Sequence, residues 1–323
     1  MELSAFAPLK GQSQAVDLLQ GAIARQRLAP AYLFAGASGV GRSLAARCLI
    51  KLLFGSGASA SGQQLIDQKL LKRNHPDLLW VEPTYLHQGQ RLSAAEATEK
   101  GLKRKAPPQI RLEQVREIAQ FLSRRPLEAS RLVVVVEQAE TMAEAAANGL
   151  LKTLEEPGQA TIILLALDTE SILPTLVSRC QRIPFYRLNR ENMTQVLRES
   201  GHGEILQHPE ILAIAQGSPG EAIAAWQQLQ TIPAELLQKL TTLPKSLRAA
   251  LELAKEIDSK LDSESQLWLV DYLQHSSWKN QQQPALLKLL EQARQYLLGY
   301  VQPRLVWEVT LAQFAQQDFR KIS

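Results

Sequence analysis

The sequence predicts an α/β domain built on a parallel sheet over residues 1–187, followed by an all-helical remainder. In the first part, short apolar runs alternate with helical patterns, and most of the 17 glycines lie there. After about residue 190, one helical pattern follows another, and four of the five tryptophans fall in this stretch. The apolar runs are continuous rather than alternating, which is typical of parallel strands covered by helices on both faces.

Five apolar runs are expected to form the strands: Ala31–Ala35, Asp77–Val81, Leu132–Val136, Thr161–Leu167 and Gln181–Phe185. The segment Ile110–Leu122 predicts an amphipathic helix, because its apolar residues recur at three- and four-residue spacing. Residues 55–62 are rich in Gly and Ser and predict a flexible surface loop. Residues 84–108 carry few large apolar groups and the run Lys103-Arg104-Lys105, so they predict a solvated insertion.

The bulk properties indicate a cytosolic chain without a disulfide or zinc framework. Net charge is +4, the pI is about 9.0, and no apolar run approaches the length of a membrane span. The start of the sequence lacks the basic and apolar stretches of a secretory signal. The two cysteines, Cys48 and Cys180, and the scattered histidines do not have the clustering that a zinc site needs.

A glycine-rich segment follows the first predicted strand and opens a helical pattern. The segment Gly36-Ala-Ser-Gly39-Val-Gly41-Arg42-Ser43 has the spacing of a phosphate-binding loop. In such a loop the glycines let backbone N–H groups converge on phosphate oxygens, and the helix N-terminus adds partial positive charge. The hydroxyl at the position of Ser43 usually holds Mg²⁺.

Two substitutions argue against a working ATP site. Arg42 stands where a lysine should reach the β- and γ-phosphates, and its planar fork is not equivalent to a compact ammonium group. Glu137-Gln138 ends the valine-rich strand, where an acidic pair should hold metal and polarise water. Glu137 could still approach Mg²⁺, but the amide of Gln138 cannot act as a general base. We expect at most weak binding of ATP or ADP, and no bound cofactor.

Two further segments resemble the signatures of bacterial clamp-loader subunits of the AAA+ family. They are Asn148-Gly-Leu-Leu-Lys-Thr-Leu-Glu-Glu-Pro157 and Leu173-Pro-Thr-Leu-Val-Ser-Arg-Cys180. With the phosphate loop, His75-Pro76-Asp77 and the strand before Glu137, the resemblance covers most of residues 1–187. It implies an AAA+ base domain over 1–187, a helical lid over 188–230 and a helical collar over 231–323.

The resemblance also implies a role and a set of partners. Family members form a five-subunit ring that loads a sliding clamp onto primed DNA, with ATPase subunits of the tau/gamma type and a delta subunit. One kind of subunit hydrolyses ATP, while another has an eroded site and keeps the arginine of the Ser-Arg-Cys motif, here Arg179. This sequence fits the second kind, with no ATPase of its own, because Arg42, Gln138, the region of Asp168 and Gly220 depart from the active pattern.

Several alternatives remain open at this point. The chain could be an ATP-hydrolysing subunit of the tau/gamma type, and Arg179 could be a structural arginine that pairs with Asp168 or Glu170. A third alternative is a DNA-binding module, using Lys69, Lys72 and Arg73 with the lysine–arginine run of the insertion, although neither cluster has interleaved aromatic residues. The apolar stripes of residues 231–323 fit either a core or a subunit interface.

Overall fold

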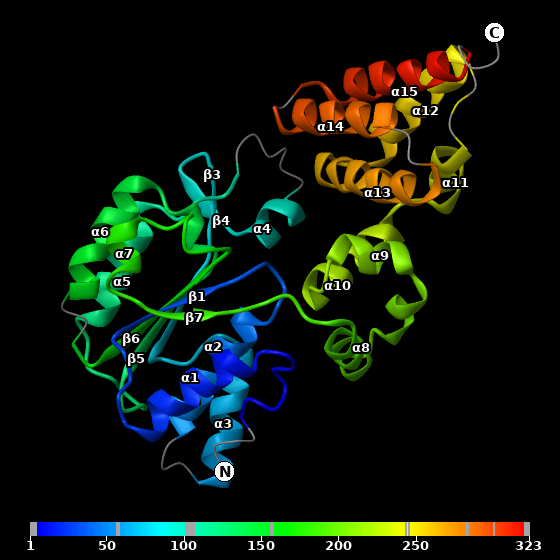
Figure 1. The fold of residues 1–323 in the computed structure, drawn as a ribbon. Coiled ribbons are helices and arrows are strands. Elements are labelled where there is room, and N and C mark those ends of the chain that lie inside the picture. Colours follow the sequence, from blue (N-terminus) through cyan, green and yellow to red (C-terminus); the bar gives the residue numbers. More distant parts are fainter. Residues whose placement is uncertain are drawn as a thin grey trace. The chain divides into compact units, whose positions relative to one another are not determined.

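The computed structural model describes residues 5–55, 59–100, 107–155, 158–242, 244, 246–281, 284–299 and 301–319. These residues form two compact units, Met1–Val196 and Leu197–Ser323, whose elements are labelled in Figure 1. No helix among the described residues has the length and apolar content that a membrane span requires. The expected division into base, lid and collar stays a prediction.

The first unit is built on a five-stranded parallel sheet with the order β2-β5-β6-β1-β7 (Figure 1). The strands are β1 Ala31–Ala35, β2 Leu78–Val81, β5 Leu132–Val136, β6 Ala160–Ala166 and β7 Gln181–Pro184. Every residue of β5 and β6 is buried, since inner strands covered on both faces need apolar side chains at every position. All five predicted strands are confirmed, with their ends shifted by one residue at most.

Helices cover both faces of this sheet, with α5 to α7 on one face and α1 to α3 on the other (Figure 1). The bounds of these helices are α1 Ser13–Ala24, α2 Arg42–Gly55, α3 Ala60–Leu71, α5 Leu112–Leu122, α6 Glu144–Glu155 and α7 Pro174–Val177. Two further helices do not cover the sheet: α4 Ala94–Glu99 follows the β3–β4 hairpin, and α8 Arg190–Glu199 spans the boundary between the two units. The predicted amphipathic helix is α5, and it buries Val115, Ile118 and Phe121 against the sheet. The parallel sheet with helices on both faces confirms the predicted fold class.

Two expectations about loops need correction. Within residues 55–62, α2 extends to Gly55 and α3 begins at Ala60, because the Ser59 side chain caps α3 by accepting from the Gly62 N–H at 3.3 Å. Residues 84–108 are not simply solvated. They form a hairpin, β3 Tyr85–His87 with β4 Gln90–Leu92, and then α4. The run Lys103-Arg104-Lys105 lies outside the described residues.

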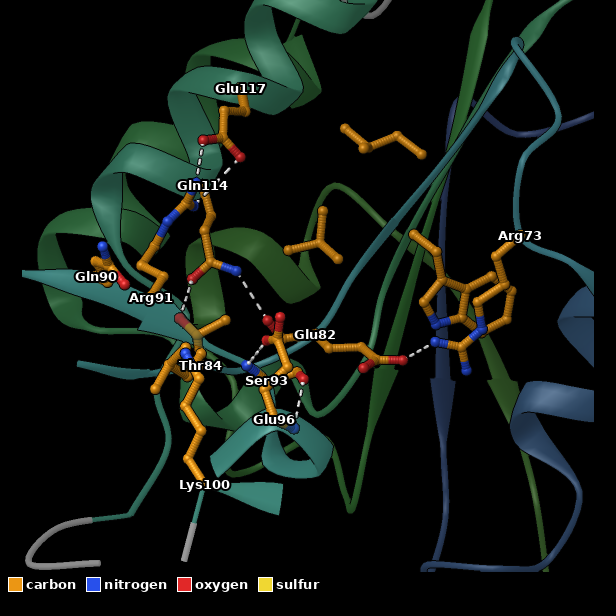
Figure 2. A pocket seen from close by; sticks show the side chains of 14 residues that line it. Arg73, Glu82, Thr84, Gln90, Arg91, Ser93, Glu96, Lys100, Gln114 and Glu117 are labelled. Atoms are coloured by element: carbon orange, nitrogen blue, oxygen red, sulfur yellow. Dashed lines mark hydrogen bonds and ion pairs between the residues drawn. The ribbon is translucent and has the colours of Figure 1, made fainter. Parts of the chain in front are cut away.

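The hairpin and α4 form one wall of a cavity of about 690 Å³ beside the edge strand β2 (Figure 2). Four of its ionic side chains form two ion pairs, Arg73 with Glu82 and Arg91 with Glu117. Gln114, 5% exposed, joins the insertion to the sheet, since it accepts from the Thr84 hydroxyl and donates to the Glu82 carbonyl. The insertion is therefore tied to the base of α5 rather than lying free in solvent.

The second unit is helical, as predicted, with its own core. Its α-helices are α9 Pro209–Ala215, α10 Pro219–Thr231, α11 Ala234–Thr242, α12 Leu247–Lys260, α13 Ser263–Gln281, α14 Pro284–Leu298 and α15 Pro303–Phe319. Trp307 is fully buried at its centre, and the indole N–H donates to Gln266 at 2.8 Å. Leu247 and Leu251 on α12, and Leu305 and Val309 on α15, remain exposed. The apolar stripes therefore supply both a core and uncovered apolar surface.

The His75-Pro76-Asp77 triplet has a structural role, because it binds the backbone of the segment that precedes β5. The Asp77 carboxylate is 1% exposed and accepts the backbone N–H groups of Leu127, Glu128 and Ala129, each at 2.7 Å. His75 accepts the Asp77 N–H through Nδ1 at 3.2 Å and so completes the turn before β2. Burial raises the pKa of Asp77, but the three N–H donors outweigh it and hold that pKa below its ordinary value.

Asp77→Asn should destabilise the protein by about 1–3 kcal/mol, because an amide turns N–H donors toward backbone N–H groups that need acceptors. Since the pKa of Asp77 is lowered in the folded state, its contribution is complete above the unfolded pKa and is lost as pH falls through the folded pKa. Urea unfolding at pH 7 and at several values below pH 5 would measure both effects.

The matched control is Asp168→Asn, since that carboxylate also accepts a backbone N–H but is exposed. It should change the free energy of unfolding little. Two results would contradict the role assigned to Asp77. One is an equal decrease in the free energy of unfolding for the two variants, and the other is an Asp77→Asn variant whose stability still falls below pH 5 as steeply as that of the wild type.

Candidate functional site

The phosphate loop keeps the backbone shape that its glycines predict. It joins β1 to α2, with Gly39 and Gly41 at φ values of 71° and 109°, a region that side chains other than glycine rarely adopt. A Cβ at Gly36 would lie 2.3 Å from the carbonyl oxygen of Phe185. Gly36 is thus required because the loop passes directly over the chain that leaves β7.

A residue that sequence reasoning missed, Gln12, holds this loop from the side. Its side chain is 2% exposed, donates to the carbonyls of Val40 (3.1 Å) and Tyr186 (2.6 Å), and accepts the Tyr186 N–H (3.1 Å). The amide thereby joins the N-terminal segment, the phosphate loop and the chain after β7. No motif marks this role, because the three segments meet only in the folded protein.

Glu137 at the end of β5 is held against the phosphate loop. The Ser43 hydroxyl donates to its Oε1 at 2.9 Å, and the indole N–H of Trp80 donates to its Oε2 at 3.0 Å. The guanidinium groups of Arg47 and Arg73 lie 5.6 Å and 5.1 Å from the Trp80 ring centroid, which favours a cation–π contact. The predicted pair of Ser43 and Glu137 is therefore brought together, while Trp80 is a partner that the sequence did not reveal.

Arg42 turns inward rather than out toward solvent. The residue is 9% exposed, and its Nη1 finds no hydrogen-bond partner among the described residues. Burial lowers the pKa of its guanidinium, while the charges of Glu140 and Glu137 raise it. The cation faces the acidic end of β5, where an active site would place metal and phosphate. Arg42 thus contributes positive charge near the acidic residues at the end of β5.

The site combines the backbone shape of a phosphate loop with side chains that depart from the usual nucleotide-binding pattern. Ser43 and Glu137 converge as metal ligands would, and a phosphate could accept from the unpaired Nη1 of Arg42. However, Gln138 is exposed, has a φ of 48° and carries an amide where a base is required. In the second unit, Gly220 lies in the first turn of α10 and offers no side chain. Neither Gln138 nor Gly220 offers a group that could activate water.

Arg179 lies in the turn between α7 and the edge strand β7, with its side chain 38% exposed. Its Nη2 donates to Glu155 at 2.7 Å, and its Nη1 donates to the Thr175 carbonyl at 3.0 Å. The alternative of a structural ion pair finds its acid on α6 rather than at Asp168 or Glu170, since Arg179 pairs with Glu155 and Asp168 accepts the Ser171 N–H. The neighbouring Cys180 is inert, because burial raises the pKa of its thiol to about 11.

Arg179 and the phosphate loop lie at opposite ends of the sheet. Strands β1 and β7 are parallel, with Tyr32 beside Gln181 and Ala35 beside Pro184. Arg179 therefore comes before the amino end of β7, whereas Gly36 follows the carboxyl end of β1. At ~3.3 Å per residue, the separation along the strands is roughly 20 Å, which is beyond the reach of an arginine side chain. Arg179 cannot serve the phosphate loop of its own chain.

The fold and these sites together define an AAA+-type subunit with a degenerate phosphate loop and an outward arginine. The family model described as "DNA polymerase III, delta subunit" matches residues 11–189. The model described as "Cyanobacterial DNA polymerase III delta prime, C-terminal domain" matches residues 191–314. The chain belongs to the DNA polymerase III delta-prime family, which confirms the clamp-loader family that the motifs predicted.

Individual relatives agree with this assignment. The delta' subunit of Bacillus subtilis is 31% identical over 180 residues, 55% of this chain and 48% of that protein. The delta' subunit of Pseudomonas aeruginosa is 33% identical over 244 residues, 73% of this chain and 67% of that protein. A gamma subunit-related protein of DNA polymerase III from Thermotoga maritima shares the fold, with a TM-score of 0.51 and 17% identity over 94% of this chain and 99% of that chain. The chain thus spans about half to two thirds of the first two relatives.

Gly36→Ala should destabilise the first unit by about 1–3 kcal/mol, since the added methyl group must displace backbone rather than a flexible side chain. Gly21→Ala is the matched control, because a Cβ there meets nothing within 4 Å in the middle of α1. It should stabilise the protein by about 0.5–1 kcal/mol. Thermal unfolding of both variants tests the packing of the loop, and a neutral Gly36→Ala would show that the approach to Phe185 is not required.

Proposed function

We propose that the chain is a non-catalytic subunit of the DNA polymerase III clamp loader that supplies Arg179 to the ATP site of a neighbouring subunit. The observation that carries this proposal is the separation of Arg179 from the phosphate loop of its own chain along the parallel strands. An exposed arginine that cannot reach its own nucleotide site remains available to the site of another chain. The proposal places the protein in the cytosol, with the replication machinery.

The chemistry of phosphoryl transfer favours this role. Charge spreads over the γ-phosphate oxygens in the transition state, and a guanidinium from an adjacent chain can stabilise it. Arg179 has a permanent charge and a planar fork that matches phosphate geometry. Its outward placement follows from packing, because Leu176 and Val177 are buried in the core of the first unit while Arg179 is exposed.

The features of the chain's own site support the loss of hydrolysis. Arg42 turns toward the acids at the end of β5, Glu137 is bonded to Ser43 and Trp80, and Gln138 offers no base. We infer that any affinity of this loop for ATP or ADP is weak and leads to no turnover. The loop instead stabilises the base of the fold through its packing on Gln12 and Phe185.

The proposed partners follow from the family. They are ATPase subunits of the tau/gamma type, the delta subunit, the sliding clamp and primed DNA. The tau subunit of Bacillus subtilis is 24% identical to this chain over 242 residues, which supports a shared ancestry with such ATPases. In the second unit, the exposed leucines of α12 and α15 are candidates for contact with other subunits in a collar.

Arg179→Ala in a reconstituted complex tests the proposal. ATP turnover stimulated by clamp and primed DNA should fall by about 10³-fold or more at the site that Arg179 serves, because the transition-state charge loses its cation. Arg179→Lys should restore only part of the activity, since lysine keeps the charge without the fork. Size-exclusion chromatography must show normal assembly of both variants, and undiminished stimulated turnover in Arg179→Ala would make the residue purely structural.

A further inference from the structure

We propose that Glu155 is a positioning residue that orients the Arg179 guanidinium toward the neighbouring active site. This inference rests on the proposed function of Arg179. The two side chains come from α6 and from the turn after α7, and the Glu155 Oε1 accepts from the Arg179 Nη2 at 2.7 Å. A second anchor, the Thr175 carbonyl, accepts from Nη1 at 3.0 Å. Two acceptors on different elements fix both the position and the plane of the guanidinium.

The anchored guanidinium retains donors for an incoming phosphate. A guanidinium has five N–H donors, and the bonds to Glu155 and Thr175 use two of them. Among the residues that the structure describes, no acceptor is bonded to the remaining three, so an oxyanion could accept from them while both anchors stay in place. Because an unanchored arginine must lose much of its rotamer freedom to meet the phosphate, prior orientation favours the transition state.

Glu155 occupies a position that is unfavourable unless a cation lies close by. It is the last residue of α6, and a carboxylate at a helix C-terminus is repelled by the negative end of the helix dipole. The cation of Arg179 offsets this repulsion. The ion pair therefore favours both side chains. It neutralises the carboxylate at the C-terminus of α6, and it holds the guanidinium of Arg179 in place.

The ion pair is not what holds α7 to α6. Leu154 on α6 and Leu176 and Val177 on α7 lie in the same buried core, and these apolar contacts secure the two helices. The side chains of Arg179 and Glu155 are 38% and 52% exposed, and ion pairs so exposed contribute little to stability. Removal of the Glu155 charge should therefore leave the fold intact, so that an effect on turnover reports on orientation.

The experiment compares Glu155→Gln with Asp67→Asn in the reconstituted complex. Asp67 is the matched control, because it forms an ion pair of similar exposure with Lys51 far from α6 and α7 in the sequence. Glu155→Gln should lower the stimulated kcat by about 2- to 5-fold, with the KM for ATP nearly unchanged, since orientation acts in the transition state. Asp67→Asn should change neither constant. Thermal unfolding of the isolated chains should be alike for both variants.

A double variant separates this inference from the proposal beneath it. If Glu155 acts through Arg179, adding Glu155→Gln to Arg179→Ala should cause no further loss. An unchanged or increased kcat in Glu155→Gln, or a further loss in the double variant, would overturn the positioning role while the arginine's own role stands. If Arg179→Ala itself leaves turnover unchanged, both the proposed function and this inference fail.

Discussion

The parallel register of the five-stranded sheet is the constraint on which the functional arrangement depends. In a parallel sheet every carboxyl end lies at one edge and every amino end at the other, so residues before and after the strands are kept apart. The phosphate loop follows β1 and Glu137 follows β5, whereas Arg179 precedes β7. In one chain, the carboxyl ends of the strands therefore carry a loop that resembles a nucleotide site, and the amino end of β7 lies beside an exposed arginine.

The phosphate loop at the carboxyl ends of the strands keeps the backbone that phosphate binding needs, but its side chains differ from those of an active nucleotide site. Gly36, Gly39 and Gly41 still meet the steric and φ requirements of the loop, and Gln12 satisfies the carbonyl of Val40. What differs is charge, because Arg42 lies buried near Glu137 and Glu140. The loop packs against Phe185 and Gln12, so a side chain at Gly36 would disturb the first unit whether or not a nucleotide binds.

The sequence predicted the parts of the fold that depend on local patterns. Continuous apolar runs located the inner strands β1, β5 and β6, because strands covered on both faces require apolar side chains at nearly every position. The edge strands β2 and β7 were also located, although β7 contains polar and exposed residues. The hairpin of residues 85–92 was missed, since its strands are short and mostly exposed. The partners Gln12, Trp80 and Glu155 were also missed, because each meets its site across a long stretch of chain. Asp168 and Glu170 were the acids considered for an alternative structural pairing of Arg179, because they are near it in sequence, but α6 brings Glu155 there.

We propose, centrally, that this chain supplies Arg179 to the ATP site of a neighbouring subunit and hydrolyses no ATP at its own phosphate loop. ATP hydrolysis by the purified, isolated chain at saturating Mg²⁺-ATP tests it most directly. The arrangement of Arg42, Glu137 and Gln138 predicts no turnover above the background that the Ser43→Ala variant shows. Steady turnover by the wild-type chain that Ser43→Ala abolishes would contradict the claim, because it would show that the phosphate loop still works as a catalytic site.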